Sequence, residues 1–153
     1  MKWIVVKENW QTTKHKLQII KYMTKVCYKL MKRAIVHDAS KYSKEEAPHF
    51  ASAGQTKDIK YDSPEYKESL KKLESALNHH YANNSHHPQH FKNGFAEMQP
   101  LDVIEMLVDW KASTTRYKGG DVRESIEINK KRFKYSEQIR KNFENFFREI
   151  NAW

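Results

Sequence analysis

Hydrophobic residues recur along most of this chain every three or four positions, which is the spacing of one face of an α-helix. The first such pattern begins after Thr12 or Thr13, either of which can cap a helix, and continues to about Lys32. Its apolar arc consists of two adjoining stripes, formed by Leu17, Ile20, Cys27, Leu30 and Met31 and by His15, Ile19, Tyr22 and Val26. A helix with so wide an apolar arc is expected to be central in the fold, with His15 facing inward.

Short helices are predicted after this first one. One covers Ala34–Asp38, and Ser43 can cap another in which Glu46 completes a capping box. Pro48 follows early in that helix, so the helix should be short or kinked. Residues 54–62 are polar and are expected to form a linker.

The second half of the chain has clear start signals for helices. Ser63-Pro64 should open a helix of about 30 Å that runs to about Asn83. Residues 84–99 are expected to form an ordered loop, and Pro100 opens a helix that closes at Gly119-Gly120.

Two capped helices complete the prediction. Asp121 caps a helix with Val122, Ile126, Asn129 and Phe133 on one face, and Ser136 caps a helix with Ile139, Phe143, Phe146 and Ile150 at helical spacing. The predicted fold is all-α, a single bundle of about six helices over residues 1–153. Its core should cover about residues 12–150, with residues 1–11 as an N-terminal extension.

Composition and charge limit the class of protein. With 153 residues, 39% hydrophobic and 31% charged, the chain fits a globular domain. Cys27 is the only cysteine, so no internal disulfide is possible and a reducing cytoplasm is the expected compartment. Trp3–Val6 is too short for a signal-peptide core, and no apolar run is long enough to span a bilayer. The net charge of +9 suggests an anionic partner, although a lysine-rich surface can equally serve solubility.

An adjacent imidazole and carboxylate, His37-Asp38, follow two hydrophobic residues on the predicted short helix. Histidine is the commonest metal ligand in proteins, but a lone pair of this kind is more often a cap or a surface ion pair. His15 alone would similarly be read as an ordinary core histidine. The two features together, on consecutive helices, indicate polar groups that converge.

Three carboxylates follow one stripe of the helix that Pro100 opens: Asp102, Glu105 and Asp109. Like charges on successive turns repel, and inside a protein they need a compensating cation. Asp109 lies between Val108 and Trp110, in the most apolar part of this helix, and so is the best candidate for a metal or a buried ion pair. Asp102 lies near the helix start, where an acid is favoured anyway.

Residues 79–90, HHYANNSHHPQH, hold five of the eight histidines. His80 continues the apolar face of Leu73 and Leu77, whereas His79 lies one position round, at a possible pocket rim. His86 and His87 lie in the following loop, which can fold back over the helix end. A polar helix terminus remains the alternative to a metal site here.

The ordered set His15, His37-Asp38, a histidine-rich segment and Asp109 resembles the HD-domain superfamily of metal-dependent phosphohydrolases. The segments HDASKYSKEE, HHYANNSHHPQH and EMLVDW together resemble a little-characterised family of small bacterial and phage proteins related to that group. The resemblance implies an all-helical fold and a first metal held by four ligands: His15, His37, Asp38 and Asp109. The histidines crowd together more than in many binuclear members, which leaves one or two ions open.

The resemblance also implies roles for the remaining candidates. His80 and His87 are the preferred ligands of a second metal, and His79 and His86 are candidates for an acid or a substrate contact. Lys41 of HDASK matches the position of a lysine that approaches the substrate phosphate, and Asp38 would orient or deprotonate the attacking water. The donor set suits Mn, Fe, Co, Ni or Zn better than Mg alone.

The expected function is hydrolysis of a nucleotide or another phosphate ester by a metal-activated water. Two alternatives stay open at this point. Some HD-domain relatives are di-iron oxygenases with a similar ligand order. A non-enzymatic nucleic-acid-binding protein could use its basic helices, yet their lysines and arginines alternate with glutamates, as on solvated outer faces.

Overall fold

The computed structural model describes residues 2–52, 59, 62–116 and 119–153, and all regular elements among them are helices. The prediction of an all-α fold is confirmed, with seven α-helices and three short 3₁₀ helices in the described part of the chain. The chain divides into two units, Met1–His37 and Asp38–Trp153, and each is treated by itself below. The predicted linker over residues 54–62 lies largely outside the described residues. The helix that Pro100 opens ends at Thr114, so its predicted closure at Gly119-Gly120 is wrong.

The first unit consists of one helix, α1 (Lys2–Val36). It begins well before Thr12, so the predicted cap at Thr12 or Thr13 is wrong; Thr13 Oγ1 instead donates to the Asn9 carbonyl inside the helix. The separate short helix predicted over Ala34–Asp38 is also wrong, because α1 continues unbroken to Val36. No glycine or proline interrupts this segment, so nothing in its sequence stops the helix earlier. The unit contains no second element against which the apolar stripe of α1 could pack, and the predicted central position of this helix stays a prediction.

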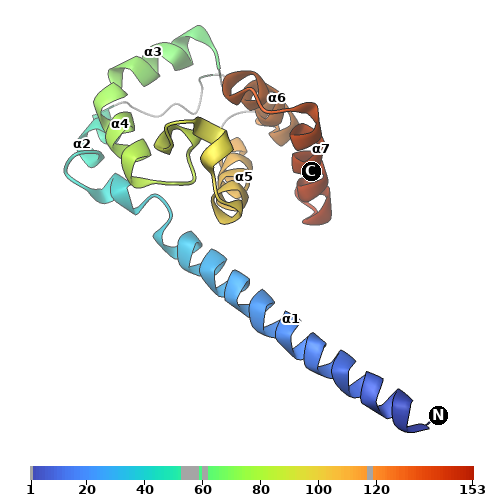
Figure 1. Ribbon diagram of the computed structural model, residues 1–153. Coiled ribbons are helices and arrows are strands. Elements are labelled where there is room, and N and C mark those ends of the chain that lie inside the picture. Colours follow the sequence, from blue (N-terminus) through green and yellow to red (C-terminus); the bar gives the residue numbers. More distant parts are fainter. Residues whose placement is uncertain (1, 53–58, 60–61, 117–118) are drawn as a thin grey trace. The chain divides into compact units, whose positions relative to one another are not determined.

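The second unit contains all other elements (Figure 1). In chain order they are η1 (Ala39–Tyr42), α2 (Ala47–Ser52), α3 (Pro64–Lys72), α4 (Glu74–Asn83), η3 (Pro88–His90), η4 (Gly94–Glu97), α5 (Pro100–Thr114), α6 (Val122–Phe133) and α7 (Glu137–Glu149). α6 packs against both α5 and α7, whereas α4 contacts α3, η1 and η3. The unit therefore has a bundle of three helices beside a group of shorter elements.

Local capping explains where several of these helices begin. Ser63, Asp121 and Ser136 each accept a hydrogen bond from a backbone N–H in the first turn of α3, α6 and α7, as predicted. The single helix predicted from Pro64 to Asn83 is instead two helices, which meet at Leu73. Leu73 itself is buried, so the break places an apolar side chain inward.

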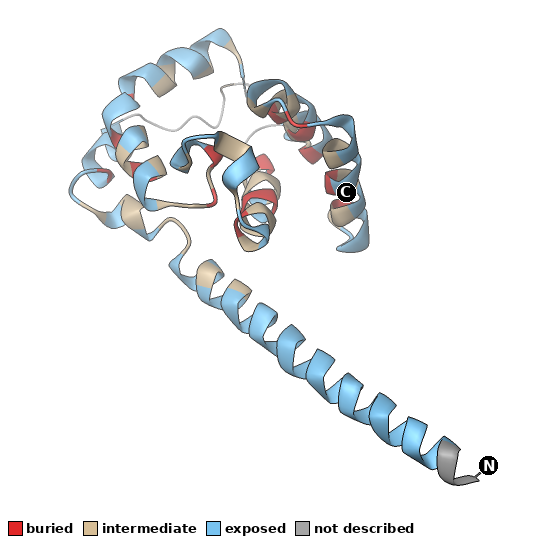
Figure 2. Ribbon diagram, viewed as in Figure 1, coloured by how far each residue is buried: buried red, intermediate tan, exposed pale blue. Residues whose placement is uncertain are grey.

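The core of the second unit lies between α5, α6, α7 and the segment that precedes α7 (Figure 2). Its buried members are Met106, Leu107, Val122, Ile126, Tyr135, Phe143 and Phe147. The Tyr135 hydroxyl, also buried, donates a 2.6 Å hydrogen bond to the Ile126 carbonyl. In α6 the buried residues are Val122, Ile126 and Asn129, three of the four that the helical periodicity placed on one face. The predicted buried face of α6 is therefore confirmed.

Gly120 allows the chain to turn closely from α5 into α6. A Cβ at this position would lie 2.1 Å from the Thr114 carbonyl oxygen, a distance that backbone atoms cannot accommodate. Only glycine therefore permits this approach, which sets the start of α6 against the end of α5.

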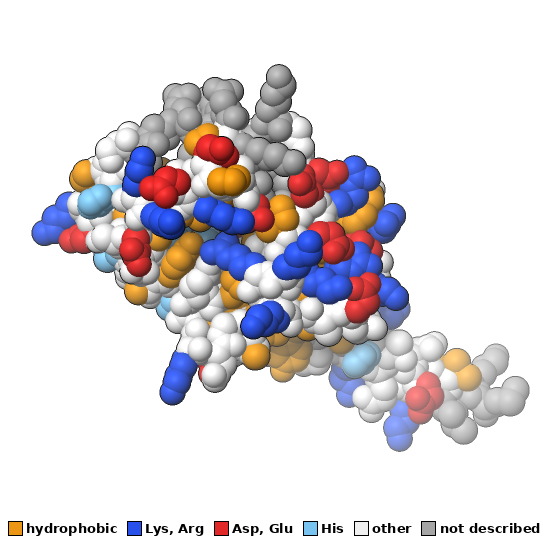
Figure 3. Space-filling view, turned by 90° about the horizontal axis from the view of Figure 1, so that it is seen from above, with side chains coloured by type: hydrophobic (Ala, Val, Ile, Leu, Met, Phe, Trp, Pro, Cys, Tyr) orange, Lys and Arg blue, Asp and Glu red, His pale blue; other side chains and the backbone are white. Residues whose placement is uncertain are grey.

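Charged side chains of both signs cover the face of the second unit seen in Figure 3. Arg140 contacts Glu137, Glu127 and Glu144, and Lys130 contacts Glu137. These exposed pairs contribute little to stability, but they neutralise much of the positive charge of α6 and α7. In the described part of the chain, no helix combines the length and apolarity needed to cross a bilayer.

Truncation of Phe147 tests the importance of this core. Phe147 is fully buried, so Phe147→Ala should lower the free energy of unfolding by about 3–5 kcal/mol. Urea unfolding followed by circular dichroism measures the change. Asn145→Ala, at an exposed position of the same helix, should stay close to wild type. Equal stability of the two variants would contradict this assignment of the core.

Candidate metal centre

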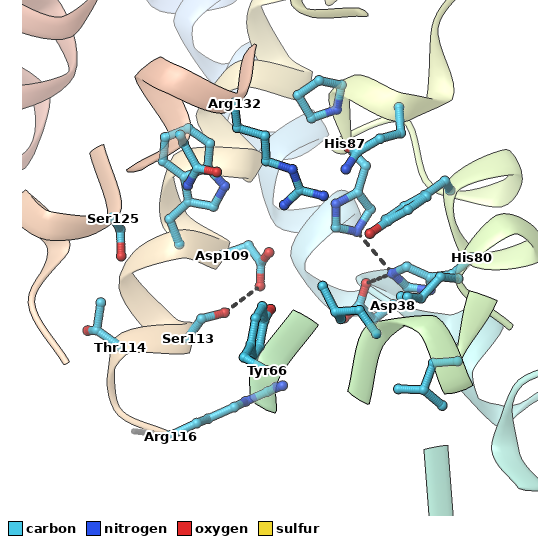
Figure 4. A pocket seen from close by; sticks show the side chains of 18 of the residues that line it. Asp38, Tyr66, His80, His87, Asp109, Ser113, Thr114, Arg116, Ser125 and Arg132 are labelled. Carbon is cyan, nitrogen blue, oxygen red and sulfur yellow. Dashed lines mark hydrogen bonds and ion pairs between the residues drawn. The ribbon is translucent and has the colours of Figure 1, made fainter. Parts of the chain in front are cut away.

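Four side chains that the sequence singled out converge in the second unit: Asp38, His80, His86 and His87. Each offers one ligand atom, and these atoms all lie within 4.8 Å of one another. Figure 4 shows His80 and His87 pointing toward each other beside Asp38. The group is largely removed from solvent, with His80 and His86 each only 3% exposed.

The shortest contacts in this group join imidazole Nε2 atoms to each other and to one carboxylate oxygen. The Nε2 atoms of His80 and His87 are 2.9 Å apart. Asp38 Oδ1 lies 3.2 Å from His80 Nε2 and 3.4 Å from His86 Nε2. Three nitrogen atoms and one oxygen atom therefore surround a common point.

The backbone and two polar side chains place these ligands. Asp38 precedes η1 in the left-handed conformation, with φ of 55°, which asparagine and aspartate tolerate better than most residues. His80 lies in the last turn of α4, and the chain then turns back so that His87 returns to it. Asn84 links the two parts: its amide donates to the His80 carbonyl and to Ser40 Oγ, both at 2.7 Å.

A buried carboxylate orients two histidines. Glu46 is fully buried, and its two oxygens lie 2.7 Å from His79 Nδ1 and 2.9 Å from His80 Nδ1. Because an ionised carboxylate can only accept, each Nδ1 must donate. In a neutral ring this leaves the Nε2 of His80 with a lone pair, directed at Asp38 and His87.

His86 is oriented in a related way. Its Nδ1 lies 3.3 Å from Glu105 Oε1, while its Nε2 faces Asp38. Partnership between an imidazole and a carboxylate on the side away from the metal is the usual arrangement around histidine ligands, where it fixes the tautomer and raises the basicity of the ligand nitrogen.

The electrostatics of the site favour charged carboxylates at Asp38 and Glu46 and a neutral imidazole at His87. Burial would raise the pKa of Asp38, but hydrogen bonds from His80, His86 and Lys41 outweigh it and hold this pKa well below its usual range. Burial would also raise the pKa of Glu46, yet contacts with His79, Ser40 and His80 lower it. Burial, together with the charges of His86 and His80, lowers the pKa of His87 to about 3.

This donor set fits a transition-metal cation. A neutral His80 would direct its Nε2 lone pair at the charged oxygen of Asp38, which is repulsive unless a proton or a cation lies between them. Neighbouring ligands at right angles, each with a metal–nitrogen bond of ~2.1 Å, lie ~3.0 Å apart, close to the separation of His80 and His87. Imidazoles with a single carboxylate suit Mn, Fe, Co, Ni or Zn better than Mg or Ca.

A cavity of about 430 Å³ opens beside these ligands. Asp38, His80 and His87 line one part of it, and Asp109 and Lys41 also line it. Further residues of its wall come from α3, α5, the turn after α5 and α6: Tyr66, Leu70, Trp110, Ser113, Arg116, Ser125, Asn129 and Arg132. The ligand group is therefore accessible to a small molecule.

The other predicted site residues have definite places. Lys41 Nζ lies 2.5 Å from Asp38 Oδ2, and Ser113 Oγ donates to Asp109 at 3.5 Å. His79 lies outside the group of four, bound to Glu46. His37 and His15 belong to the first unit, where His37 is the last residue before Asp38. The prediction that both hold one ion is wrong, because the continuous α1 separates His15 from His37 by about 33 Å. The role of His37 as a ligand stays a prediction.

The structure gives some residues a different part from the one expected. His86, expected as an acid or substrate contact, is buried among the potential ligands; its expected role stays a prediction. Glu46 was assigned to a capping box, whereas it lies under two histidines; α2 begins only at Ala47, too late for that box. Asp102 caps α5 by accepting from the Gln99 N–H, as its place near the helix start suggested. No local signal marks Glu46 or Glu105 as partners of histidine, because both pairings are tertiary.

The chain belongs to a family described as "Family of unknown function (DUF5662)", whose model matches residues 5–151. Neither the comparison with curated proteins nor the comparison with solved structures gave a match. The family assignment brings no activity with it, so the chemistry must be argued from the site.

Replacement of His80 tests the metal site. The protein, purified without a histidine tag, should bind a divalent transition metal, and His80→Ala should lose most of this binding because it removes the ligand at the centre of the group. Inductively coupled plasma mass spectrometry and titration with Co²⁺ measure it. His90→Ala is the matched control, since His90 is exposed and its Nδ1 contacts the Tyr81 carbonyl. Equal metal content of both variants would exclude this site.

Replacement of Glu46 tests the orienting carboxylate. Because the folded state lowers the pKa of Glu46, its carboxylate stabilises the fold above the ordinary value of 4.5, and this contribution is lost as the pH falls through the lower folded value. Glu46→Gln should therefore unfold about 1–3 kcal/mol more easily near neutral pH, and the gap should close in acid. Urea unfolding in EDTA at several pH values measures it.

The neighbouring acid supplies the control for this experiment. Glu45 is exposed, so Glu45→Gln should match wild type at every pH. With metal present, Glu46→Gln should also weaken metal binding by about 10–100-fold, as loss of a ligand's outer partner usually does. A stability gap that stays constant from neutral pH into acid would show that Glu46 does not act as a carboxylate.

Proposed function

We propose that this protein is a metal-dependent phosphohydrolase that cleaves a phosphate ester, with nucleotides as the preferred substrate class. The observation that carries the proposal is the convergence of three imidazoles and Asp38, oriented by outer carboxylates, beside a cavity lined by cationic side chains. The cations of this wall are Lys41, Arg116 and Arg132.

The charges around the cavity support an anionic substrate. A divalent cation would balance Asp38 and Asp109, two carboxylates of the cavity wall whose charges act on His87, which leaves Lys41 and Arg132 available to a phosphate. Figure 4 shows the Arg132 side chain directed to the region between Asp109 and His87. A guanidinium there can bind two phosphoryl oxygens at once.

The metal and the protein would share the chemistry. A divalent cation supplies Lewis acidity, which makes water a nucleophile near neutral pH and reduces the charge on the phosphoryl group. Asp38 would orient the attacking water, because its ionised carboxylate faces the centre of the group. The low pKa of this carboxyl makes it a weak base, so the water would give its proton to solvent. Water oxygen then bonds to phosphorus, the ester P–O bond breaks, and the leaving oxygen takes a proton.

Lys41 would neutralise the phosphoryl oxygens, since its Nζ lies beside Asp38 at the wall of the cavity. His87 also lines the cavity and is the loop histidine best placed to meet the leaving group. His79 and His86 remain candidates for an acid, although neither is among the described residues of the cavity wall.

The relation to the HD-domain superfamily forms part of this proposal. The order His15, His37-Asp38, histidine-rich segment and Asp109 supports it by resemblance. Under this proposal His37, which precedes Asp38 in the chain, and Asp109 would complete the ligands of the first ion, and a second ion would use His80 and His87. His15 is left out of this set, because α1 runs unbroken between His15 and His37 and separates them by about 33 Å.

Replacement of Asp38 tests the proposed activity. Purified protein is assayed against nucleoside monophosphates and bis-p-nitrophenyl phosphate with added Mn, Co, Ni, Zn, Fe or Mg. At least one pair of metal and substrate should give phosphate-ester hydrolysis that Asp38→Asn lowers by about 10²–10⁴-fold, because the variant loses the negative charge that would hold the metal and orient the water. Glu149→Gln makes the same charge change at an exposed site of α7 and should retain activity.

The same assay separates the alternatives. Oxygen consumption by the iron form without release of phosphate would favour the di-iron oxygenase and overturn hydrolysis. Steeply salt-dependent binding of DNA or RNA that persists in EDTA, with no hydrolysis, would favour a nucleic-acid-binding protein. Unchanged hydrolysis by Asp38→Asn would remove Asp38 from the mechanism.

A further inference from the structure

The cavity extends from the ligand group to a second end. In Figure 4, His80 and Asp38 lie on one side, whereas Ser113, Thr114 and Ser125 lie on the other. Asn129 of α6 lines the same cavity. A substrate whose phosphate lies at the ligand group therefore has room in the cavity for the rest of the molecule. The remaining residues of the cavity wall would contact that part of the substrate.

Asn129 is a buried polar residue of this cavity wall, and no hydrogen bond to its side chain is found among the described residues. It is 2% exposed and lies on the buried face of α6 with Val122 and Ile126. Among the residues that the structure describes, none makes a hydrogen bond with its side-chain amide. Buried amides are nearly always hydrogen-bonded, because removal from water without a partner is costly.

The neighbouring hydroxyl groups differ from Asn129 in this respect. Thr114 Oγ1 donates to the Lys111 carbonyl at 2.7 Å, and Ser125 Oγ donates to the Asp121 carbonyl at 3.3 Å. Their protons are already committed to the protein. Asn129 thus provides both a donor and an acceptor that remain available to a ligand.

The wall around this end suits a flat ring. Tyr66, Trp110 and Phe133 all line the cavity, and the rings of Trp110 and Phe133 are nearly parallel, at 8°. Aromatic side chains stack on planar heterocycles, and this interaction tolerates different rings because each has a π-face. Selection among such rings must then come from hydrogen bonds at their edges.

We infer that Asn129 is a specificity-determining residue whose amide hydrogen-bonds the edge of a nucleobase in the cavity. The inference rests on the proposed function for its phosphate end, but the base contact itself can be tested without phosphate. A primary amide presents a carbonyl acceptor beside an N–H donor, and it pairs with a ring edge that offers the reverse order, as adenine N6 and N7 do. Asn129 would thereby choose between bases that stack equally well.

Binding of free nucleosides tests this assignment. Adenosine, guanosine, cytidine and uridine carry the base without the phosphate, so their binding does not depend on hydrolysis. Protein-observed NMR or equilibrium dialysis of the full chain measures it. At least one nucleoside should bind wild type, and Asn129→Leu, which keeps the branched shape but replaces the amide by two methyl groups, should weaken that binding by about 10–100-fold, the contribution of one bidentate pair.

Two controls accompany the measurement. Asn145→Leu, at an exposed position of α7, should bind nucleosides like wild type, and the metal content of Asn129→Leu should equal that of wild type. Asn129→Asp keeps the shape of the side chain but exchanges its N–H donor for an acceptor, so it should change the order of preference among the four nucleosides. This second variant decides the question if Asn129→Leu fails to fold.

The outcomes separate this inference from the proposed function. No nucleoside binding to wild type at millimolar concentration, equal binding to Asn129→Leu, or an unchanged order of preference in Asn129→Asp would overturn the inference. If nucleosides bind wild type but not Asn129→Leu, and no phosphate ester is hydrolysed, the inference is upheld. Only the proposed phosphohydrolase activity is then contradicted.

Discussion

The candidate site depends on one buried carboxylate, that of Glu46. It accepts hydrogen bonds from Nδ1 of both His79 and His80, and it has no exposure to water. This contact joins the turn before α2 to the last turns of α4, two segments more than thirty positions apart in the chain. The carboxylate can remain charged in this position because two imidazole donors replace its hydration. Without it, the tautomer of His80 would be undetermined, and its Nε2 would have no fixed role.

The group that Glu46 orients is not an arrangement chosen for stability alone. Three imidazoles crowd around Asp38, and the mutual influence of their charges contributes to the low pKa of His87. A core built only for stability would replace such a group with apolar side chains, which pack without a desolvation cost. Clusters of buried charged and polar side chains lower the stability of the free protein, but they can bind an ion favourably. Such clusters are typical of functional sites. The same reasoning applies to Asn129, whose buried amide gains a partner only from a ligand.

The sequence predicted those parts of the molecule that local physics controls. The caps at Ser63, Asp121 and Ser136 and the buried face of α6 follow from spacing and side-chain chemistry within one or two turns. Glu46 shows the limit of this approach: its sequence context fits a capping box, and only the return of α4 reveals its contact with histidine. The break at Leu73 escaped prediction for a related reason, because no glycine or proline marks it and the burial of Leu73 accompanies it.

The candidate ligands were recognisable by type but not by role. The sequence predicted convergence of Asp38 with His80 and His87, and the structure brings these three together. It did not distinguish His79 from His86, since both flank the predicted ligands at similar spacing. The distinction arises in the turn after α4, where Asn84 holds the chain so that His86 faces inward beside Glu105, whereas His79 remains on the outer side of Glu46.

The two ends of the cavity would contribute differently to catalysis. Contacts with the phosphoryl group change as the reaction proceeds, so Asp38, Lys41 and the metal can lower the barrier directly. Contacts between Asn129 and a base stay constant through the reaction and cannot do so by themselves. These contacts would instead position the substrate. A base bound against α6 restricts where the phosphate can lie and directs it to the ligand group. Under the proposed function, a cavity lined both by candidate metal ligands and by the amide of Asn129 suits a substrate with one charged end and one flat, hydrogen-bonding end.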